Sequence, residues 1–152
     1  MGVDTQLASA AFHEALAAGR VAGLRGTVAR EVGLPGGRLD FRVGAGKGGA
    51  WVEVKAVNLV RDGVALFPDA PSTRAARHAD LVARCARRGE RAMMAFVVLR
   101  PDARRFAVNE AADPAFAAAL ARARRAGVEV QVRGCAVSAS EVRLTGSLPW
   151  GP

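Results

Sequence analysis

Lysine is almost missing from this chain. Of its 22 basic residues only Lys47 and Lys55 are lysines, and the remaining twenty are arginines. Arginine serves wherever a generic positive charge is enough, but it neither loses its proton nor acts as a compact point charge. A lysine that persists against this bias therefore marks either a position that requires an ammonium group or an accident on a solvated strand face.

Several other absences narrow the class of protein. The chain has no charge-free run of about 18 apolar residues, and no basic flank precedes an apolar stretch near the N-terminus, so we expect no membrane span, no secretory signal and a cytoplasmic location. Cys85 and Cys135 lie too far apart for a zinc-binding pair and are too few for a disulfide framework. With no tyrosine and two tryptophans, the chain is poorly supplied for stacking on nucleobases.

What the chain does have is positive charge. The net charge of +8 and the pI near 11.3 favour a polyanionic partner, of which nucleic acid is the leading candidate. Because stacking residues are scarce, contacts to the phosphate backbone are the expected mode of binding. Arginine-rich coding bias is the alternative explanation for the charge.

The length of 152 residues and the hydrophobic content of 51% suit one domain with a real core. Apolar spacing and turn residues predict an alternation of elements in the order α, several β, α, β, α, β. The expected helices cover 6–18, 72–88 and 114–127, and the expected strands cover 27–32, 39–43, 51–58, 64–67, 92–99 and 128–132. The first four strands form an expected antiparallel meander.

The register of the second and third strands predicts a site. Antiparallel pairing around the loop 44–49 places three apolar pairs on one face: Val43 with Ala50, Phe41 with Val52, and Leu39 with Val54. The same register sets Asp40 opposite Glu53, with Cβ atoms roughly 5 Å apart. Facing carboxylates repel unless one is protonated or a cation lies between them, and Mg²⁺ or Mn²⁺ is the cation we expect.

Glu31 is a second-rank candidate for this site. If Pro35 and Gly36 form the turn between the first two strands, Val32 pairs with Leu39 and Glu31 faces Asp40. Three carboxylates would then line up. Pro-Gly favours a type II turn, which matches hairpin twist poorly, so the register of this hairpin stays open.

Lys55 lies two residues beyond Glu53 and therefore points to the same face. Carboxylates that fix a metal ion, beside an ammonium that holds water or offsets developing charge, are the components of metal-dependent phosphodiester hydrolysis. The Glu-x-Lys pattern alone is weak evidence for a nuclease site, since alternating charges occur on any exposed strand. The matching register of Asp40 strengthens this evidence.

At this point the motifs resemble a known family. The segments Gly37-Arg-Leu-Asp40-Phe41, Trp51-Val-Glu-Val-Lys55, Phe67-Pro-Asp-Ala-Pro71 with Arg74 and His78, and Arg100-Pro-Asp-Ala103 are similar to the sugar fermentation stimulation protein A (SfsA) family, and the likeness continues to Leu148-Pro149. The resemblance implies an α/β fold with a PD-(D/E)xK restriction-endonuclease-like core, a mixed sheet flanked by helices, and DNA binding. It assigns Asp40, Glu53 and Lys55 to the acidic, acidic and lysine positions of the nuclease motif.

The resemblance also sets an expectation for domain organisation. Family members usually carry an additional N-terminal OB-like domain, so residues 1–152 are expected to be a single nuclease-like domain without it. Gly37 stands where a serine is common, and Ala56 and Asn58 also depart from the usual pattern. None of these departures removes a proposed ligand.

Other polar residues have two interpretations. His78 falls at helical spacing among apolar residues, which favours a buried, hydrogen-bonded histidine over a catalytic one. Asp69 is expected to cap or turn the chain, or to support a metal site. The arginines expected to contact phosphates, with a merely solvated stripe as the alternative, are Arg38, Arg42, Arg74, Arg77 and Arg84.

The sequence thus predicts a DNA-binding domain with a Mg²⁺- or Mn²⁺-dependent nuclease centre. Asp40 and Glu53 would bind the metal, Lys55 would position water, and Glu31 would assist. The competing hypothesis is a non-catalytic DNA-binding or regulatory module of sugar metabolism that keeps the nuclease fold. A metal-dependent hydrolase of small phosphates is a weaker alternative, since the sequence offers no signature of a small-molecule pocket. The loop with Lys47 lacks a P-loop ending, which argues against nucleotide binding there.

Overall fold

A computed structural model describes residues 2–150 of the chain. Six strands form the main sheet in the order β1-β2-β3-β6-β8-β9, and three more form a small second sheet in the order β4-β5-β7. The elements of the main sheet are β1 (Val28–Leu34), β2 (Gly37–Val43), β3 (Ala50–Val57), β6 (Arg91–Val98), β8 (Glu129–Val137) and β9 (Val142–Ser147). Because β3, β6 and β8 run parallel and the outer pairs run antiparallel, the sheet is mixed.

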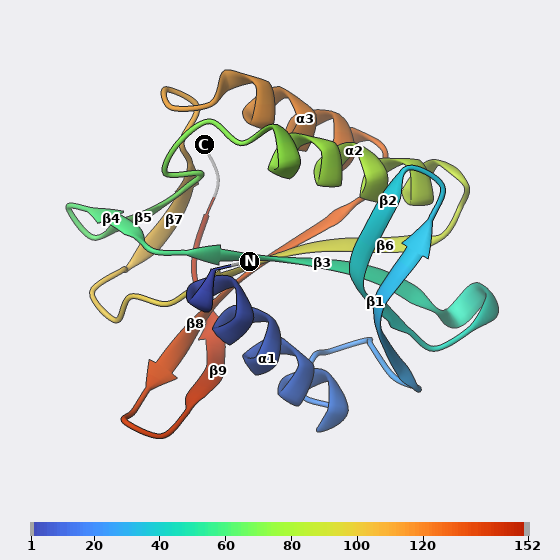
Figure 1. Cartoon of the computed structure of the whole chain (residues 1–152), viewed down its shortest axis with the longest axis horizontal. Helices are drawn as coiled ribbons and strands as arrows, with labels where there is room; N and C mark the ends of the chain where they lie inside the picture. Colours follow the sequence, from blue (N-terminus) through green and yellow to red (C-terminus); the bar gives the residue numbers. More distant parts are fainter. Residues whose placement is uncertain (1, 151–152) are drawn as a thin grey trace.

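Helices cover both faces of this sheet. Helix α1 (Val3–Ala17) packs on one face, whereas α2 (Thr73–Arg87) and α3 (Pro114–Arg125) lie together on the other (Figure 1). The central strand β6 is buried on both sides: Met94 and Phe96 face α2 and α3, while Met93 and Ala95 face α1. A continuous apolar run is the sequence pattern that such a strand requires.

The expected meander is correct for three strands and wrong for the fourth. β1, β2 and β3 are successive antiparallel neighbours, but β5 (Val64–Phe67) leaves the main sheet. It pairs with β4 (Leu59–Arg61) in a hairpin and, in parallel, with β7 (Arg105–Val108). Strands β4, β7 and β9 were not predicted; β4 and β7 are only three and four residues long.

The predicted starts of α2 and α3 are confirmed by their caps, whereas α1 begins at Val3, before the predicted residue 6. The Ser72 hydroxyl accepts a hydrogen bond from Ala75 N–H at 3.0 Å and begins α2. The buried Asp113 carboxylate begins α3 by accepting from Phe116 N–H at 3.0 Å. Its second oxygen accepts from Ser72 N–H at 2.8 Å, so one side chain ties the starts of both helices together.

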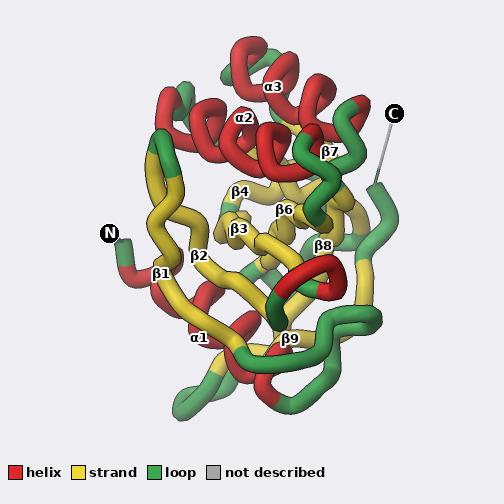
Figure 2. The backbone as a smooth tube through the Cα atoms, turned by 90° about the vertical axis from the view of Figure 1, so that its right-hand side faces the viewer, coloured by secondary structure: helices red, strands yellow, loops and turns green. Residues whose placement is uncertain are grey.

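The hairpin of β1 and β2 has the register predicted from the Pro35-Gly36 turn, with Val32 paired to Leu39. The ladder omits Glu31, whose φ of 50° lies in the left-handed region that non-glycine residues rarely adopt. Arg84 holds the tip of this hairpin to α2 by donating to the Pro35 carbonyl at 2.8 Å. Figure 2 shows the tip of the β1–β2 hairpin beside α2. β2 is thereby fixed against the helix that faces the predicted site.

No helix among residues 2–150 is long and apolar enough to cross a membrane.

Cys85 and Cys135 are both free thiols, as expected. Burial raises the pKa of each, to about 11 for Cys135.

Candidate active site

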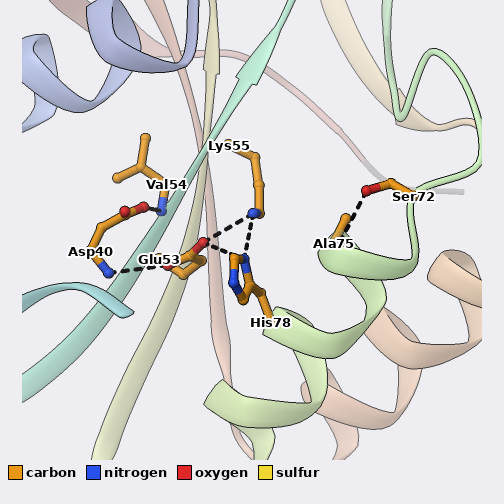
Figure 3. Close-up of polar contacts among 7 residues, drawn as sticks. All are labelled: Asp40, Glu53, Val54, Lys55, Ser72, Ala75 and His78. Carbon is orange, nitrogen blue, oxygen red and sulfur yellow. Dashed lines mark hydrogen bonds and ion pairs between the residues drawn. The ribbon is translucent and has the colours of Figure 1, made fainter. Parts of the chain in front are cut away.

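The candidate site lies where β2 and β3 part. Their ladder pairs Phe41–Val43 with Ala50–Val52, in the register predicted, and then stops. Beyond it, side chains replace backbone partners: Asp40 N–H donates to Glu53 Oε1 at 3.1 Å, and Val54 N–H donates to Asp40 Oδ2 at 2.8 Å (Figure 3). Two carboxylates therefore meet between the strands, and each accepts a hydrogen bond from a backbone N–H of the neighbouring strand.

This opening also corrects one predicted position. Leu39 was expected to share a face with Phe41 and Val43, opposite Val54. It is instead buried in the cluster on the α2 side, whereas Phe41 and Val43 pack on the α1 side. The insertion of the Asp40 carboxylate takes the hydrogen bond of Val54 N–H that a regular ladder would use, so strand alternation does not continue through residue 40.

Lys55 is at the site, as predicted from its position two residues after Glu53. Its ammonium lies 3.0 Å from Glu53 Oε2, and its side chain is 13% exposed. Glu53 is almost completely buried. A buried carboxylate with an adjacent cation is a stable ion pair only when its other hydrogen bonds are made, and here Asp40 N–H supplies one of them.

The site contains one residue that sequence reasoning placed in the core. His78, from the second turn of α2, brings Nδ1 to 2.7 Å from Glu53 Oε2 and to 2.7 Å from Lys55 Nζ. Its helical spacing among apolar residues concealed this role. The signal that pointed to it was its occurrence with Arg74 in the family-like motif.

The pKa values of the two carboxyl groups move in opposite directions. Burial and the negative charge of Glu53 raise the pKa of Asp40 to about 7. Burial also works to raise the pKa of Glu53, but hydrogen bonding to His78 and the charge of Lys55 outweigh it and hold that pKa below its usual value. One carboxyl thus retains a proton near neutrality, which is one of the two solutions expected for facing carboxylates.

Space next to the carboxylates is open. Asp40 and Glu53 together line two concavities of about 190 and 220 Å³. Arg74 borders both, Arg38 and His78 border the larger, and Thr5 of α1 borders the smaller. This opening has room for an ion with its water molecules.

Glu31 lies nearby but does not complete a three-carboxylate set. It is exposed and borders two concavities with Asp40. No group of three or more His, Cys, Asp or Glu side chains in residues 2–150 has the arrangement of a metal site. The left-handed backbone at Glu31 interrupts the alignment with Asp40 and Glu53 that regular pairing would give.

The five candidate arginines separate into three groups. Arg38 and Arg74 border the site, and Arg77 is exposed on α2. Arg84 is engaged with Pro35, and the Arg42 guanidinium lies over the ring of Trp51, 5.0 Å from its centroid. Asp69 is exposed, and the cap of α2 is Ser72 instead.

The raised pKa of Asp40 predicts how stability varies with pH. An unfolded chain ionises this carboxyl near pH 4 and the folded protein near pH 7, so folding stability from this group falls as pH rises between these values. Asp40→Asn does not ionise. The difference in free energy of unfolding between Asp40→Asn and the wild type, measured in EDTA, should therefore shift in favour of the variant by on the order of 3 kcal/mol between pH 5 and pH 8.

Urea unfolding at the two pH values measures this gain. Exposed Asp102, which pairs with Arg100, provides the control, because Asp102→Asn should leave the pH dependence unchanged. A constant difference between Asp40→Asn and wild type would contradict the raised pKa.

A mixed sheet with helices on both faces, and an acidic pair and a lysine on two neighbouring strands, defines a restriction-endonuclease-like α/β domain. A family model described as "Sugar fermentation stimulation protein RE domain" matches residues 6–141. The chain belongs to the sugar fermentation stimulation protein family.

Individual relatives agree. A "Sugar fermentation stimulation protein homolog" of Chloroflexus aggregans is 43% identical over 82% of this chain and 48% of its own length. The homolog of Desulforamulus reducens is 36% identical over 98% of this chain and 63% of its own length. A solved structure described as "The structure of Pyrococcus Furiosus SfsA in complex with Ca2+" superposes with a TM-score of 0.89 at 32% identity, covering 99% of this chain and 66% of that one. The chain thus spans about half to two thirds of these relatives.

Proposed function

We propose that this domain binds DNA and hydrolyses its phosphodiester bonds with Mg²⁺ or Mn²⁺ as cofactor. The observation that carries the proposal is the meeting of Asp40, Glu53 and Lys55 where β2 and β3 part, beside open space bordered by arginine. The Ca²⁺ in the related Pyrococcus furiosus structure adds support for a divalent ion.

The residues fit such an ion. Burial and the adjacent Glu53 carboxylate raise the pKa of Asp40 to about 7, and a divalent cation would relieve the repulsion between the two carboxylates. Mg²⁺ commonly binds one or two carboxylates and keeps several waters, which suits this acidic pair. Asp40 and Glu53 would hold the ion, which supplies Lewis acidity that activates water near neutral pH.

The remaining roles fall to the chain's own side chains. Water attacks phosphorus, and the bond from phosphorus to one sugar oxygen breaks, giving a phosphate monoester and a free hydroxyl group. The Lys55 ammonium is placed to orient the water and to offset negative charge on the reacting phosphate. Arg38 of β2 and Arg74 of α2 both line the larger concavity and are placed to bind the phosphates of a DNA strand.

Nicking of supercoiled plasmid tests the proposal. With Mg²⁺ or Mn²⁺, the wild type should convert supercoiled to open-circular DNA, and EDTA should stop the reaction. Cleavage no faster than that of a Lys55→Ala protein would contradict the catalytic role.

A second candidate function, a non-catalytic DNA-binding module, is favoured by the +8 charge. Both functions require phosphate contacts beside the site. Arg74→Ala should therefore weaken duplex binding several-fold at low salt and reduce the slope of log affinity against log salt by about 1.

Mobility-shift titrations at two salt concentrations, with EDTA present, measure this slope. Arg143→Ala provides the control, because Arg143 is exposed on β9, at the opposite edge of the sheet from β1. An identical loss of duplex affinity in both variants would show that only the net charge of the protein governs binding. Binding in this assay, combined with no nicking of supercoiled plasmid in Mg²⁺ or Mn²⁺, would favour the non-catalytic module.

A further inference from the structure

We infer that His78 is a positioning residue that fixes Glu53 and Lys55 for metal binding. This inference rests on the proposed function. Its basis is a triangle of short contacts: His78 Nδ1 lies 2.7 Å from both Glu53 Oε2 and Lys55 Nζ, which are 3.0 Å from each other (Figure 3).

The contacts of His78 differ from those of an ordinary core histidine. A ring nitrogen carries at most one proton, so Nδ1 either donates to Glu53 or accepts from Lys55. In either arrangement Nδ1 forms one hydrogen bond, and the imidazole lies against both the acid and the lysine. The ring also borders the concavity of about 220 Å³ shared with Asp40, so it lies at the open side of the site.

The helix that carries His78 is held at both ends. At its start, Ser72 caps α2 and is itself bound by the Asp113 carboxylate. Near its end, Arg84 donates to the Pro35 carbonyl of the β1–β2 hairpin. α2 is therefore anchored both to α3 and to the strand that carries Asp40, and the imidazole is presented from a rigid element.

The imidazole accounts for the orientation of the Glu53 carboxylate. Oε1 is held by Asp40 N–H, and Oε2 is held by His78 and Lys55. Without the ring, Oε2 keeps Lys55 as its only contact in the described site. The ammonium then loses its contact with Nδ1, so its ion pair with the carboxylate competes more strongly with an incoming cation. Loss of a group that orients a metal ligand usually weakens metal binding about 10- to 100-fold.

Mn²⁺ binding tests this role without depending on catalysis. Free Mn²⁺ would be measured by electron paramagnetic resonance, with calorimetry in parallel, on wild type, His78→Ala, His78→Asn and His78→Gln. His78→Ala should bind Mn²⁺ about 10- to 100-fold more weakly. His78→Asn should recover most of the affinity, because its amide nitrogen lies near the position of Nδ1, whereas the longer Gln side chain should not.

Two comparisons decide the result. Wild-type affinity in His78→Ala would overturn the inference, and if that variant does not fold, equal affinity of the Asn and Gln variants would overturn it. Asp40→Ala separates this from the proposed function. If Asp40→Ala leaves Mn²⁺ binding intact, the proposed metal site itself is wrong; if it abolishes binding while His78→Ala does not, only the role of His78 fails.

Discussion

A protein in which arginine replaces Lys55 is expected to cleave DNA at no more than about 1% of the wild-type rate, close to the level of Lys55→Ala. The Lys55→Arg substitution retains the positive charge but replaces the compact ammonium with a guanidinium of different shape. The ammonium occupies a nearly buried position within 3.0 Å of both Glu53 Oε2 and His78 Nδ1, where a longer, planar guanidinium does not fit without moving them.

Single-turnover cleavage with saturating Mg²⁺ measures the effect. Arg143→Lys, the reverse exchange on the far edge strand, should keep the wild-type rate. Cleavage by Lys55→Arg within a few-fold of wild type would mean that position 55 needs only a positive charge. The scarcity of lysine in this arginine-rich chain would then have no chemical meaning at this position.

Phe96→Ala is expected to destabilise the fold by about 3–5 kcal/mol, a large part of the total stability of a domain of this size. Phe96 is fully buried in the central strand. Its ring lies 4.8 Å from that of Phe106 and 5.4 Å from that of Phe67, measured between centroids. Removing it leaves a cavity where the main sheet, the small sheet and α3 pack together.

Thermal and urea unfolding in EDTA would measure this loss without a contribution from metal. Val137→Ala is the control, because Val137 is 57% exposed and should contribute little. A loss below about 1 kcal/mol for Phe96→Ala would show that the surrounding rings close the cavity.

Much of the site was predictable from strand register alone. Alternation and the turn at Gly44–Gly49 were sufficient to align Phe41 with Val52, and hence to bring Asp40 to Glu53. What alternation cannot predict is a ladder that ends because side chains take over its hydrogen bonds. Leu39 was therefore assigned to the wrong face, although the carboxylate pair that caused the change was identified correctly.

Contacts between distant elements were the part least accessible from sequence. His78 and Lys55 are 23 positions apart and meet only because α2 crosses over β3. Helical spacing placed His78 among apolar residues of α2 that are indeed buried, but spacing does not reveal the polar group on the facing strand. Arg74 and Arg84 likewise look equivalent on one helix, yet one borders the site and the other holds a hairpin.

The left-handed residue on β1 has a consequence for self-association. β1 is an edge strand, and edge strands offer free backbone groups that can recruit a strand from another molecule. Glu31 interrupts this edge with its φ of 50° and its charge, leaving three ladder residues on either side of the break. A copy of the chain would meet an edge interrupted at Glu31 and carrying two charged side chains, Arg30 and Glu31, so the break protects the sheet from aggregation through this edge.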